Sequence, residues 1–209
     1  MNFTTILEAS PIRGYYEEAP LIGDFIASGE TAAKMYLFLS DGVRYSEDGV
    51  TWSNAAAPWD SSYLNYVGIA FDGTVYIMGG DITEANHPAE AGDSGKTSVN
   101  HVWSSKKPED PDSWVMTPAP WNARMWPSLA IHEDAIWMTG GYSNVIGINY
   151  SDTWRFDGSV WRKIWTDPDY SSRHAATMYS MNGELFMVAG NRNPDVGQTM
   201  SDIWVLRPF

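Results

Sequence analysis

The sequence predicts an all-β protein, a small β-propeller of four four-stranded blades, and three observations support that prediction. Two short apolar segments joined by a tight turn occur three times, at intervals of about fifty to sixty residues. Each copy is followed by a strand that contains Trp. The 18 Gly and 12 Pro are scattered at short intervals, as expected for many short strands joined by turns. Four short strands in a repeat of this length are typical of a propeller blade.

The hairpin of each copy is marked by its turn and by its end. Asp-Gly and Asn-Gly between apolar segments are the strongest local signal for a β-hairpin. The second strand ends in two small residues, which let backbones approach closely where strands converge. The turns are Asp72-Gly73, Glu133-Asp134 and Asn182-Gly183, and the small pairs are Gly79-Gly80, Gly140-Gly141 and Ala189-Gly190.

Trp residues mark the outer strands. A third strand is expected at each of Trp103, Trp154 and Trp204, and a fourth at Trp114 and Trp161. An earlier, degraded copy has expected strands at 24–28, 34–39, 43–46 and 50–52. In that copy the turn Glu47-Asp48-Gly49 precedes the fourth strand, and Ser40 stands where the other copies have their final glycine.

The last copy stops after its third strand, and residues 2–6 form a spare strand at the other end of the sequence. If Phe3 takes the place of the fourth-strand Trp, the N-terminal strand completes the last blade and no open sheet edge remains to aggregate. We therefore expect one domain over 1–209, with blades at 22–54, 66–118, 127–166 and 174–207 plus 2–7. The alternatives are a piece of a larger propeller, an open array of sheets, or a larger ring formed by oligomerisation.

The order of Gly-Gly, third-strand Trp, fourth-strand Trp and then Arg resembles the kelch repeat. The resemblance is strong from Tyr66 to Leu206 and weak before that. It implies that Arg124 and Arg173 brace adjacent blades, with Tyr63 in the same position of another blade. Residues 46–52 also resemble the Asp-box turn of sialidase-like propellers, to which we assign a structural role.

Composition excludes several classes of function. A net charge of −13 disfavours nucleic acid and anionic membrane surfaces, because both are bound through Lys and Arg. The absence of Cys excludes disulfides, thiolate zinc sites and the Cys–Tyr cofactor of galactose oxidase. No signal peptide and no apolar stretch of about 20 residues is visible. We expect a soluble protein, cytoplasmic or virion-associated, without membrane insertion.

The kelch resemblance implies that two sets of loops share one face and carry any ligand. The first set, 81–100, 142–152 and 191–202, offers Asp81, His87, Tyr142 and Asn191. The second set repeats an aromatic beside a polar residue, and offers Tyr16, Trp59, Asp60, Trp121, Asn122 and Tyr170. Such rings either stack on sugars or wedge between blades. The long loop 81–100 is either a carboxylate-lined cation site or a solvated insertion, and we predict no metal.

No residue pattern identifies a catalytic centre. The four His lack a nucleophile motif, and 26 acidic residues allow some carboxylate pair without indicating one. We predict a non-catalytic binding or assembly module without a cofactor, which recognises a protein or glycan through its loop face. It could be a subunit of a larger assembly such as a phage tail or virion surface. The alternative is a glycan-acting enzyme, of glycosidase or sugar epimerase type, with carboxylates at the channel mouth.

Overall fold

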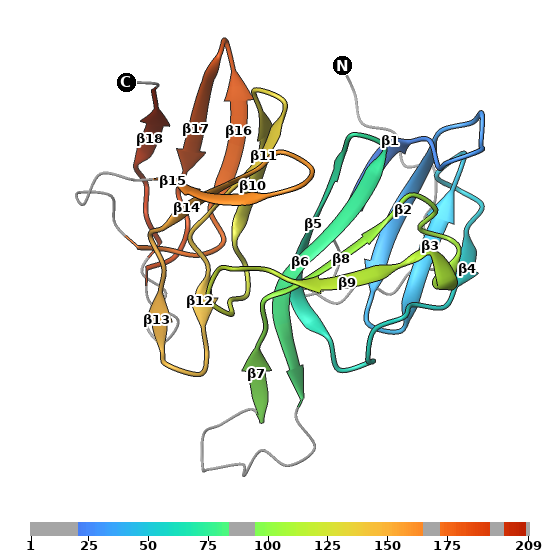
Figure 1. The fold of residues 1–209 in the computed structure, drawn as a ribbon, viewed down its shortest axis with the longest axis horizontal. Helices are drawn as coiled ribbons and strands as arrows, with labels where there is room; N and C mark the ends of the chain where they lie inside the picture. Colours follow the sequence, from blue (N-terminus) through green and yellow to red (C-terminus); the bar gives the residue numbers. More distant parts are fainter. Residues whose placement is uncertain (1–20, 84–94, 165–171, 193–198, 208–209) are drawn as a thin grey trace.

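The computed structural model describes residues 21–83, 95–164, 172–192 and 199–207. The chain is all-β, with four small antiparallel sheets in a ring that form a four-bladed β-propeller. Figure 1 shows the sheets of the N-terminal half on one side and those of the C-terminal half on the other. The fold class predicted from the sequence is therefore confirmed. Within the described ranges the one helical segment is a short 3-10 turn, η1 (Pro111–Ser113).

Blade 1 contains four strands in sequential order. They are β1 (Leu21–Phe25), β2 (Lys34–Leu39), β3 (Gly42–Ser46) and β4 (Ser53–Ala55). The predicted second strand is correct, but the predicted fourth strand at 50–52 is wrong. The Asp48 carboxylate accepts hydrogen bonds from the N–H groups of Thr51 and Val50, at 2.7 and 2.8 Å. Those residues therefore belong to the turn, and the strand begins after Trp52.

Blade 2 is the largest sheet. Its strands β5 (Leu64–Phe71), β6 (Thr74–Thr83), β8 (His101–Ser105) and β9 (Val115–Pro118) lie in that order, and β7 (Lys96–Ser98) pairs with the far end of β6. Blade 3 has β10 (Ser128–His132), β11 (Ala135–Thr139), β14 (Thr153–Phe156) and β15 (Trp161–Ile164). A separate small hairpin, β12 (Tyr142–Ser143) with β13 (Ile148–Asn149), is inserted between β11 and β14.

Blade 4 has three strands among the described residues. They are β16 (Thr177–Met181), β17 (Glu184–Val188) and β18 (Ile203–Leu206). The N-terminal strand expected to complete this blade lies outside the described residues.

The predicted two-residue hairpin turns are confirmed. In blades 2, 3 and 4 both turn residues have positive φ, from 46° to 79°, which is the conformation of a type I′ turn. This turn matches the right-handed twist of the flanking strands, and Asp-Gly and Asn-Gly adopt it with little strain. The local sequence therefore determines the register of each first hairpin.

The outer turns of blades 1 and 3 are built on one Asp each. Asp157 accepts hydrogen bonds from the N–H groups of Val160 and Ser159, at 3.0 and 3.1 Å, as Asp48 does in blade 1. These backbone donors lower the pKa of both carboxyls to about 2, because they stabilise the charged form. In each blade a Trp follows four residues after that Asp, so the Asx turn positions a Trp at the start of the outer strand: Trp52 directly before β4, and Trp161 as the first residue of β15.

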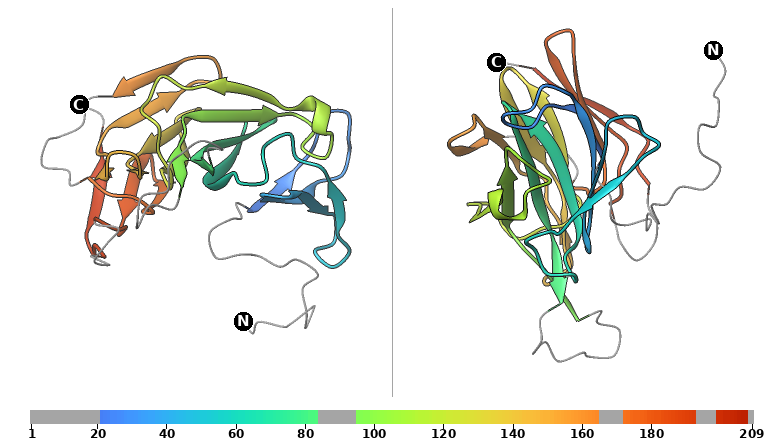
Figure 2. Two further views of the ribbon diagram at one scale, coloured as in Figure 1. Left: turned by 90° about the horizontal axis from the view of Figure 1, so that it is seen from below. Right: turned by 90° about the vertical axis from the view of Figure 1, so that its right-hand side faces the viewer.

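The core lies between successive blades, which follow one another in chain order around the propeller (Figure 2). Tyr36 and Phe38 of blade 1 pack in one cluster with Ile77 of blade 2. Met78, from the opposite face of blade 2, packs with Ile136 of blade 3. A third cluster joins blades 3 and 4. Each inner blade thus buries apolar residues on both faces.

Backbone hydrogen bonds also join the blades where their first strands pack together. Asn65 is the second residue of β5, whereas Trp126 and Ala175 lie just before β10 and β16, and all three have φ between 51° and 58°. The N–H of Trp126 donates to the carbonyl of Asn65 at 3.1 Å, and the N–H of Ala175 donates to that of Trp126 at 3.0 Å. The blades are therefore linked head to tail by main chain as well as by side chains.

Candidate functional site

The buried arginines form the junctions between blades. The guanidinium of Arg124 donates to the Gly140 carbonyl at 2.8 Å and to both carboxylate oxygens of Asp152, at 2.6 and 3.1 Å. Those partners lie in its own blade 3. Its backbone carbonyl accepts from the N–H of Gly80 in blade 2, at 2.9 Å. One residue thus ties two blades together.

The same junction is repeated one blade later. Arg173 donates to Asp202 at 2.5 and 2.9 Å and to the carbonyl of Ala189, and its own carbonyl accepts from Gly141. Hydrogen bonding from Arg173 lowers the pKa of Asp202 to about 2. Both arginines are fully buried. Each guanidinium braces and is neutralised within its own blade, whereas the link to the adjacent blade is made by the backbone carbonyl of the arginine.

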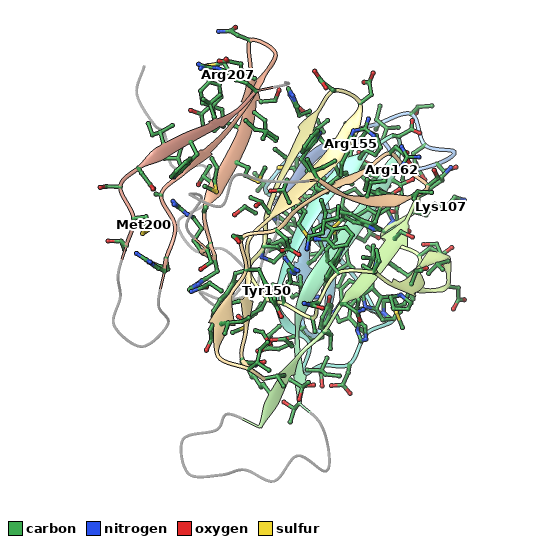
Figure 3. All side chains as sticks on the ribbon, turned by 60° about the vertical axis from the view of Figure 1, so that its left-hand side comes forward. Lys107, Tyr150, Arg155, Arg162, Met200 and Arg207 are labelled. Carbon is green, nitrogen blue, oxygen red and sulfur yellow. The ribbon has the colours of Figure 1, made fainter. Side chains whose placement is uncertain are left out.

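The ring of Tyr150 covers the Arg124 side chain, with the guanidinium carbon 4.1 Å from the ring centroid. Tyr150 lies at the base of the β12–β13 hairpin (Figure 3). Burial by itself would raise the pKa of Asp152, but the hydrogen bond and charge of Arg124 hold it below its ordinary value. This ion pair therefore also supports the root of the hairpin.

Blade 2 replaces the ion pair with neutral groups. The hydroxyl of Tyr63 donates to the carbonyl of Gly79, where the arginines use their guanidinium. His101 occupies the position of Asp152 and Asp202, two residues before the third-strand Trp, and its ring lies 6.2 Å from that of Tyr63. Trp154 and Trp204 donate to those aspartates, whereas the buried Nε1 of Trp103 has no hydrogen-bond partner among the described residues.

The predicted rings Trp59 and Trp121 are buried between blades. Trp59 packs against Trp114 with ring centroids 5.2 Å apart, and its Nε1 donates to the carbonyl of Leu39 in blade 1. Trp121 packs edge-on against Trp161 at 6.0 Å. Of the two interpretations considered for these rings, the wedge describes their packing, so we do not carry them into the proposed binding surface.

The polar neighbours of these rings are exposed. Asp60 accepts a hydrogen bond from the backbone N–H of Ser62 at 2.7 Å, and bonding by Ser62 lowers its pKa. Asn122 lies beside the junction, where its carbonyl accepts from Nε of Arg124 at 2.9 Å. Asp60 and Asn122 thus belong to the turns that lead into blades 2 and 3.

One predicted residue, Asp81, lies in a buried polar cluster at the flank of the β12–β13 hairpin. Its carboxylate accepts from Nδ2 of Asn65 at 3.1 Å and from Nδ2 of Asn144 at 3.4 Å. Asn144 also accepts from the backbone N–H and the hydroxyl of Ser98, at 2.8 and 2.6 Å. The hairpin of blade 3 is therefore attached to the loop of blade 2.

The other flank of the hairpin is attached to blade 4. Nδ1 of His174 lies 2.6 Å from Oδ1 of Asn149, and an amide oxygen only accepts, so the ring carries its proton on Nδ1. Asn149 Nδ2 also donates to the carbonyl of Arg192. Burial lowers the pKa of His174. The His174 ring stacks on Trp126 at 5.3 Å, with the predicted Tyr142 at 5.6 Å.

The predicted Asn191 completes this contact. Its backbone N–H and carbonyl exchange two hydrogen bonds with His174, at 2.8 and 3.0 Å. The structure thus brings three of the predicted residues together at the β12–β13 hairpin: Tyr142 lies in the hairpin, Asp81 at one flank and Asn191 at the other. Tyr16, His87 and Tyr170 lie outside the described residues.

The tip of the hairpin is apolar and exposed. Val145, Ile146 and Ile148 have exposed fractions of 59%, 60% and 44%. The hairpin and β7 extend at the same end of the molecule (Figure 1). The hydrogen bonds at both flanks hold this tip away from the sheets, so three aliphatic side chains are presented on a braced support.

Two further features of the described residues bear on ligands. No group of three His, Asp or Glu side chains within the described ranges is arranged to hold a metal ion. In the same ranges, no helix has the length and apolar character that crossing a membrane requires.

Comparison with known proteins supports the fold class. No protein-family model and no curated protein matches the chain. Among solved structures the chain is similar to YjhT, a propeller protein, with 15% sequence identity and a TM-score of 0.55. The match covers 81% of this chain and 58% of the YjhT chain. At this identity the likeness shows the fold alone, and the class of the protein is a β-propeller.

Sequence reasoning missed the residues that build the hairpin. Asn144, Asn149 and His174 have no local signature, because their partners come from other blades. The apolar tip did leave a signal. Val145, Ile146 and Ile148 are aliphatic residues within a predicted loop, 142–152, whose other residues are mostly polar or small.

Proposed function

We propose that this propeller is a non-catalytic binding module that contacts a protein partner through its loop face, with the β12–β13 hairpin as the central contact. The observation that supports it is the exposed tip of Val145, Ile146 and Ile148, braced by hydrogen bonds to blades 2 and 4. Aliphatic residues held on a rigid support lose little conformational entropy on binding, which favours affinity.

The chemistry of this tip favours a protein over a glycan. Sugars are held by exposed aromatic rings and hydrogen-bonding groups, whereas the rings of Trp59 and Trp121 are buried. Aliphatic side chains gain affinity by entering an apolar depression, which a folded protein provides. The partner is therefore a protein with an apolar pocket, and assembly into a larger particle is one setting for such a contact.

The kelch character of the repeats is part of this proposal. It is supported by the Gly-Gly pairs of blades 2 and 3. It is also supported by the buried arginines and third-strand Trp residues of blades 3 and 4, which make equivalent contacts with Asp152 and Asp202. In this arrangement the junctions use the charged residues for stability, and the inserted loops remain free to vary for recognition.

The test compares the wild type with a triple variant, Val145→Ser, Ile146→Ser and Ile148→Thr. Each protein is immobilised, partners are captured from a lysate of the source, and any captured protein is purified and titrated. We expect the hairpin variant to bind that protein at least about 100-fold more weakly, since burying two such side chains contributes about 3 kcal/mol.

A matched control makes the same kind of substitution outside the β12–β13 hairpin. Val115→Ser with Val160→Ser removes two exposed aliphatic side chains from β9 and the outer turn of blade 3 and should leave the affinity unchanged. Equal binding by the hairpin variant would contradict the proposal. So would glycan-array binding that the hairpin variant retains, or turnover of aryl glycosides, because these indicate a glycan site or an enzyme.

A further inference from the structure

Blade 4 has one face that none of the apolar clusters of the described residues covers. Direct cross-strand partners lie on the same side of a sheet, so Leu185 and Leu206, which pack with Trp137, mark the side turned toward blade 3. The opposite side, named the outer face of blade 4, carries two cross-strand rows. They are Tyr179, Phe186 and Val205, and Thr177, Val188 and Ile203. The three clusters join blades 1 and 2, 2 and 3, and 3 and 4, so in the described ranges the clustered apolar packing of blade 4 is on its other face.

The outer face of blade 4 is apolar and exposed, whereas the same face of blade 3 is buried. Ile203 has an exposed fraction of 66%, and Thr153, at the equivalent position of blade 3, is buried. The equivalence follows from register, because Ile203 lies opposite Val188 as Thr153 lies opposite Thr139. Five of the six residues in the two rows are apolar and none is charged. A contiguous exposed patch of this kind indicates an interaction surface.

The charge of blade 4 differs from that of the whole chain. Its described residues, 172–192 and 199–207, contain three Arg and two acidic residues, a net charge of +1 with His neutral, whereas the chain carries −13. Two of these Arg are paired inside the blade, Arg173 with Asp202 at 2.5 Å and Arg207 with Glu184 at 2.7 Å. Charges farther away than about 8 Å are largely screened at physiological salt. Two copies of the chain can therefore meet through blade 4 with little repulsion.

We propose that the outer face of blade 4 binds the same face of a second copy, in a dimer with two-fold symmetry. Such an interface is self-complementary, because each contact occurs twice. With the symmetry axis across the strands, the row that contains Phe186 lies over the row that contains Val188 of the second copy. Larger side chains then face smaller ones, as in two sheets that pack face to face about 10 Å apart.

The size of the face predicts a weak dimer. Its three strands have four or five residues each, so the sheet extends about 15 Å in each direction. An area of this extent buries less than the roughly 800 Å² per partner of a standard interface. We therefore expect a dissociation constant above about 1 µM, which calls for measurements at high protein concentration.

Sedimentation velocity between about 1 and 500 µM tests the dimer. The wild type should pass from monomer to dimer in this range. Ile203→Asp should raise the dissociation constant at least about 100-fold, because the symmetric interface would bury two unpaired carboxylates. The matched control is Val115→Asp, which makes the same charge change at a 59% exposed aliphatic residue of β9 and should dimerise like the wild type.

If the Asp variant does not fold, Ile203→Thr replaces it, because Thr already holds this position in blade 3. It should weaken the dimer at least about tenfold. The triple hairpin variant of the proposed function should dimerise like the wild type, which separates the two surfaces. Three outcomes overturn the proposal: a wild type that stays monomeric throughout the range, equal weakening in the Val115 variant, or loss of the dimer in the hairpin variant.

Discussion

Blades 3 and 4 each contain a first β-hairpin, a buried arginine and an Asp–Trp contact. They differ at the small residue that follows the second strand of that first hairpin. In blade 3 this residue is Gly140, directly after β11 of the β10–β11 hairpin, and a Cβ there would lie 2.4 Å from the carbonyl oxygen of Arg173. Ala189 holds the same position in blade 4, at φ +59°. This position of the hairpin therefore tolerates a Cβ. Blade 3 requires glycine there because the backbone of blade 4 lies against it.

The outer faces of the two blades differ accordingly. Trp137 of blade 3 packs against blade 4 in the third core cluster. Phe186, its counterpart on the same face of blade 4, stacks on Tyr179, which is 37% exposed, with centroids 5.3 Å apart. Blade 3 is thus buried on both faces, through blades 2 and 4, whereas the outer face of blade 4 is partly exposed.

The largest expected effect comes from removing the buried arginine of blade 3. Arg124→Met leaves Asp152 without its partner and removes the bond to Gly140, so we expect the free energy of unfolding to fall by about 3–5 kcal/mol. Denaturant titration measures it. Arg173→Met should cost less, because the Asp202 side chain is 36% exposed and that of Asp152 is 14% exposed. The reverse order would contradict the comparison of the two blades.

The next effect tests the glycine directly. Gly140→Ala should lower the free energy of unfolding by at least about 3 kcal/mol, more than left-handed strain alone, because the new Cβ meets backbone. Gly147→Ala is the matched control. It has φ +66° against +69°, with nothing within 4 Å of its Cβ, and it should cost about 1 kcal/mol. Equal losses in the two variants would mean that backbone conformation, and not the next blade, requires the glycine.

A smaller effect is expected from giving blade 2 the ion pair of blades 3 and 4. Tyr63→Arg with His101→Asp supplies the pair and provides an acceptor for Nε1 of Trp103. We expect each single change to destabilise and the double variant to recover about 1–2 kcal/mol as coupling energy. A double-mutant cycle in urea measures it, and additive losses would show that blade 2 cannot hold the pair.

The smallest effect concerns pH at the hairpin. Burial lowers the pKa of His174 below its ordinary value of 6.5. The unfolded chain therefore takes up the proton first, so this stability is present above about pH 6.5 and is lost as the pH falls through the lower folded-state pKa. His174→Gln should flatten the decline between pH 7 and 5. Burial also lowers the pKa of His101, so the variant retains part of the slope. An unchanged profile would exclude His174 as a contributor.

The parts of the fold that could be predicted are those determined by local chemistry. The turns at Asp72-Gly73 and Asn182-Gly183 need only their own two residues. The kelch resemblance indicated a packing role for Arg124, and its side chain is buried against Gly140 and Asp152. The fourth strand of blade 1 was misplaced, because the Asp48 side chain binds the N–H groups that a strand would use.

The candidate site was less predictable because it depends on neighbouring blades. Whether Trp59 faces solvent or a core is decided by blades 1 and 2 together, and its sequence context, Pro-Trp-Asp, is compatible with both. The partners of Asn144 and Asn149 lie 46 and 25 residues away. No periodicity in one repeat indicates contacts of that range.

The main-chain hydrogen bonds between blades affect how the number of blades in such a protein can change during evolution. The N–H of Trp126 donates to the carbonyl of Asn65, and the N–H of Ala175 donates to the carbonyl of Trp126. These hydrogen bonds do not depend on side-chain identity. A tandem duplication of blade 3 would repeat Trp126, whose N–H donates to the preceding blade and whose carbonyl accepts from the following blade. Insertion or loss of a whole unit therefore leaves no main-chain group unmatched at the new boundary, so blade number can evolve by duplication without redesign of the junction.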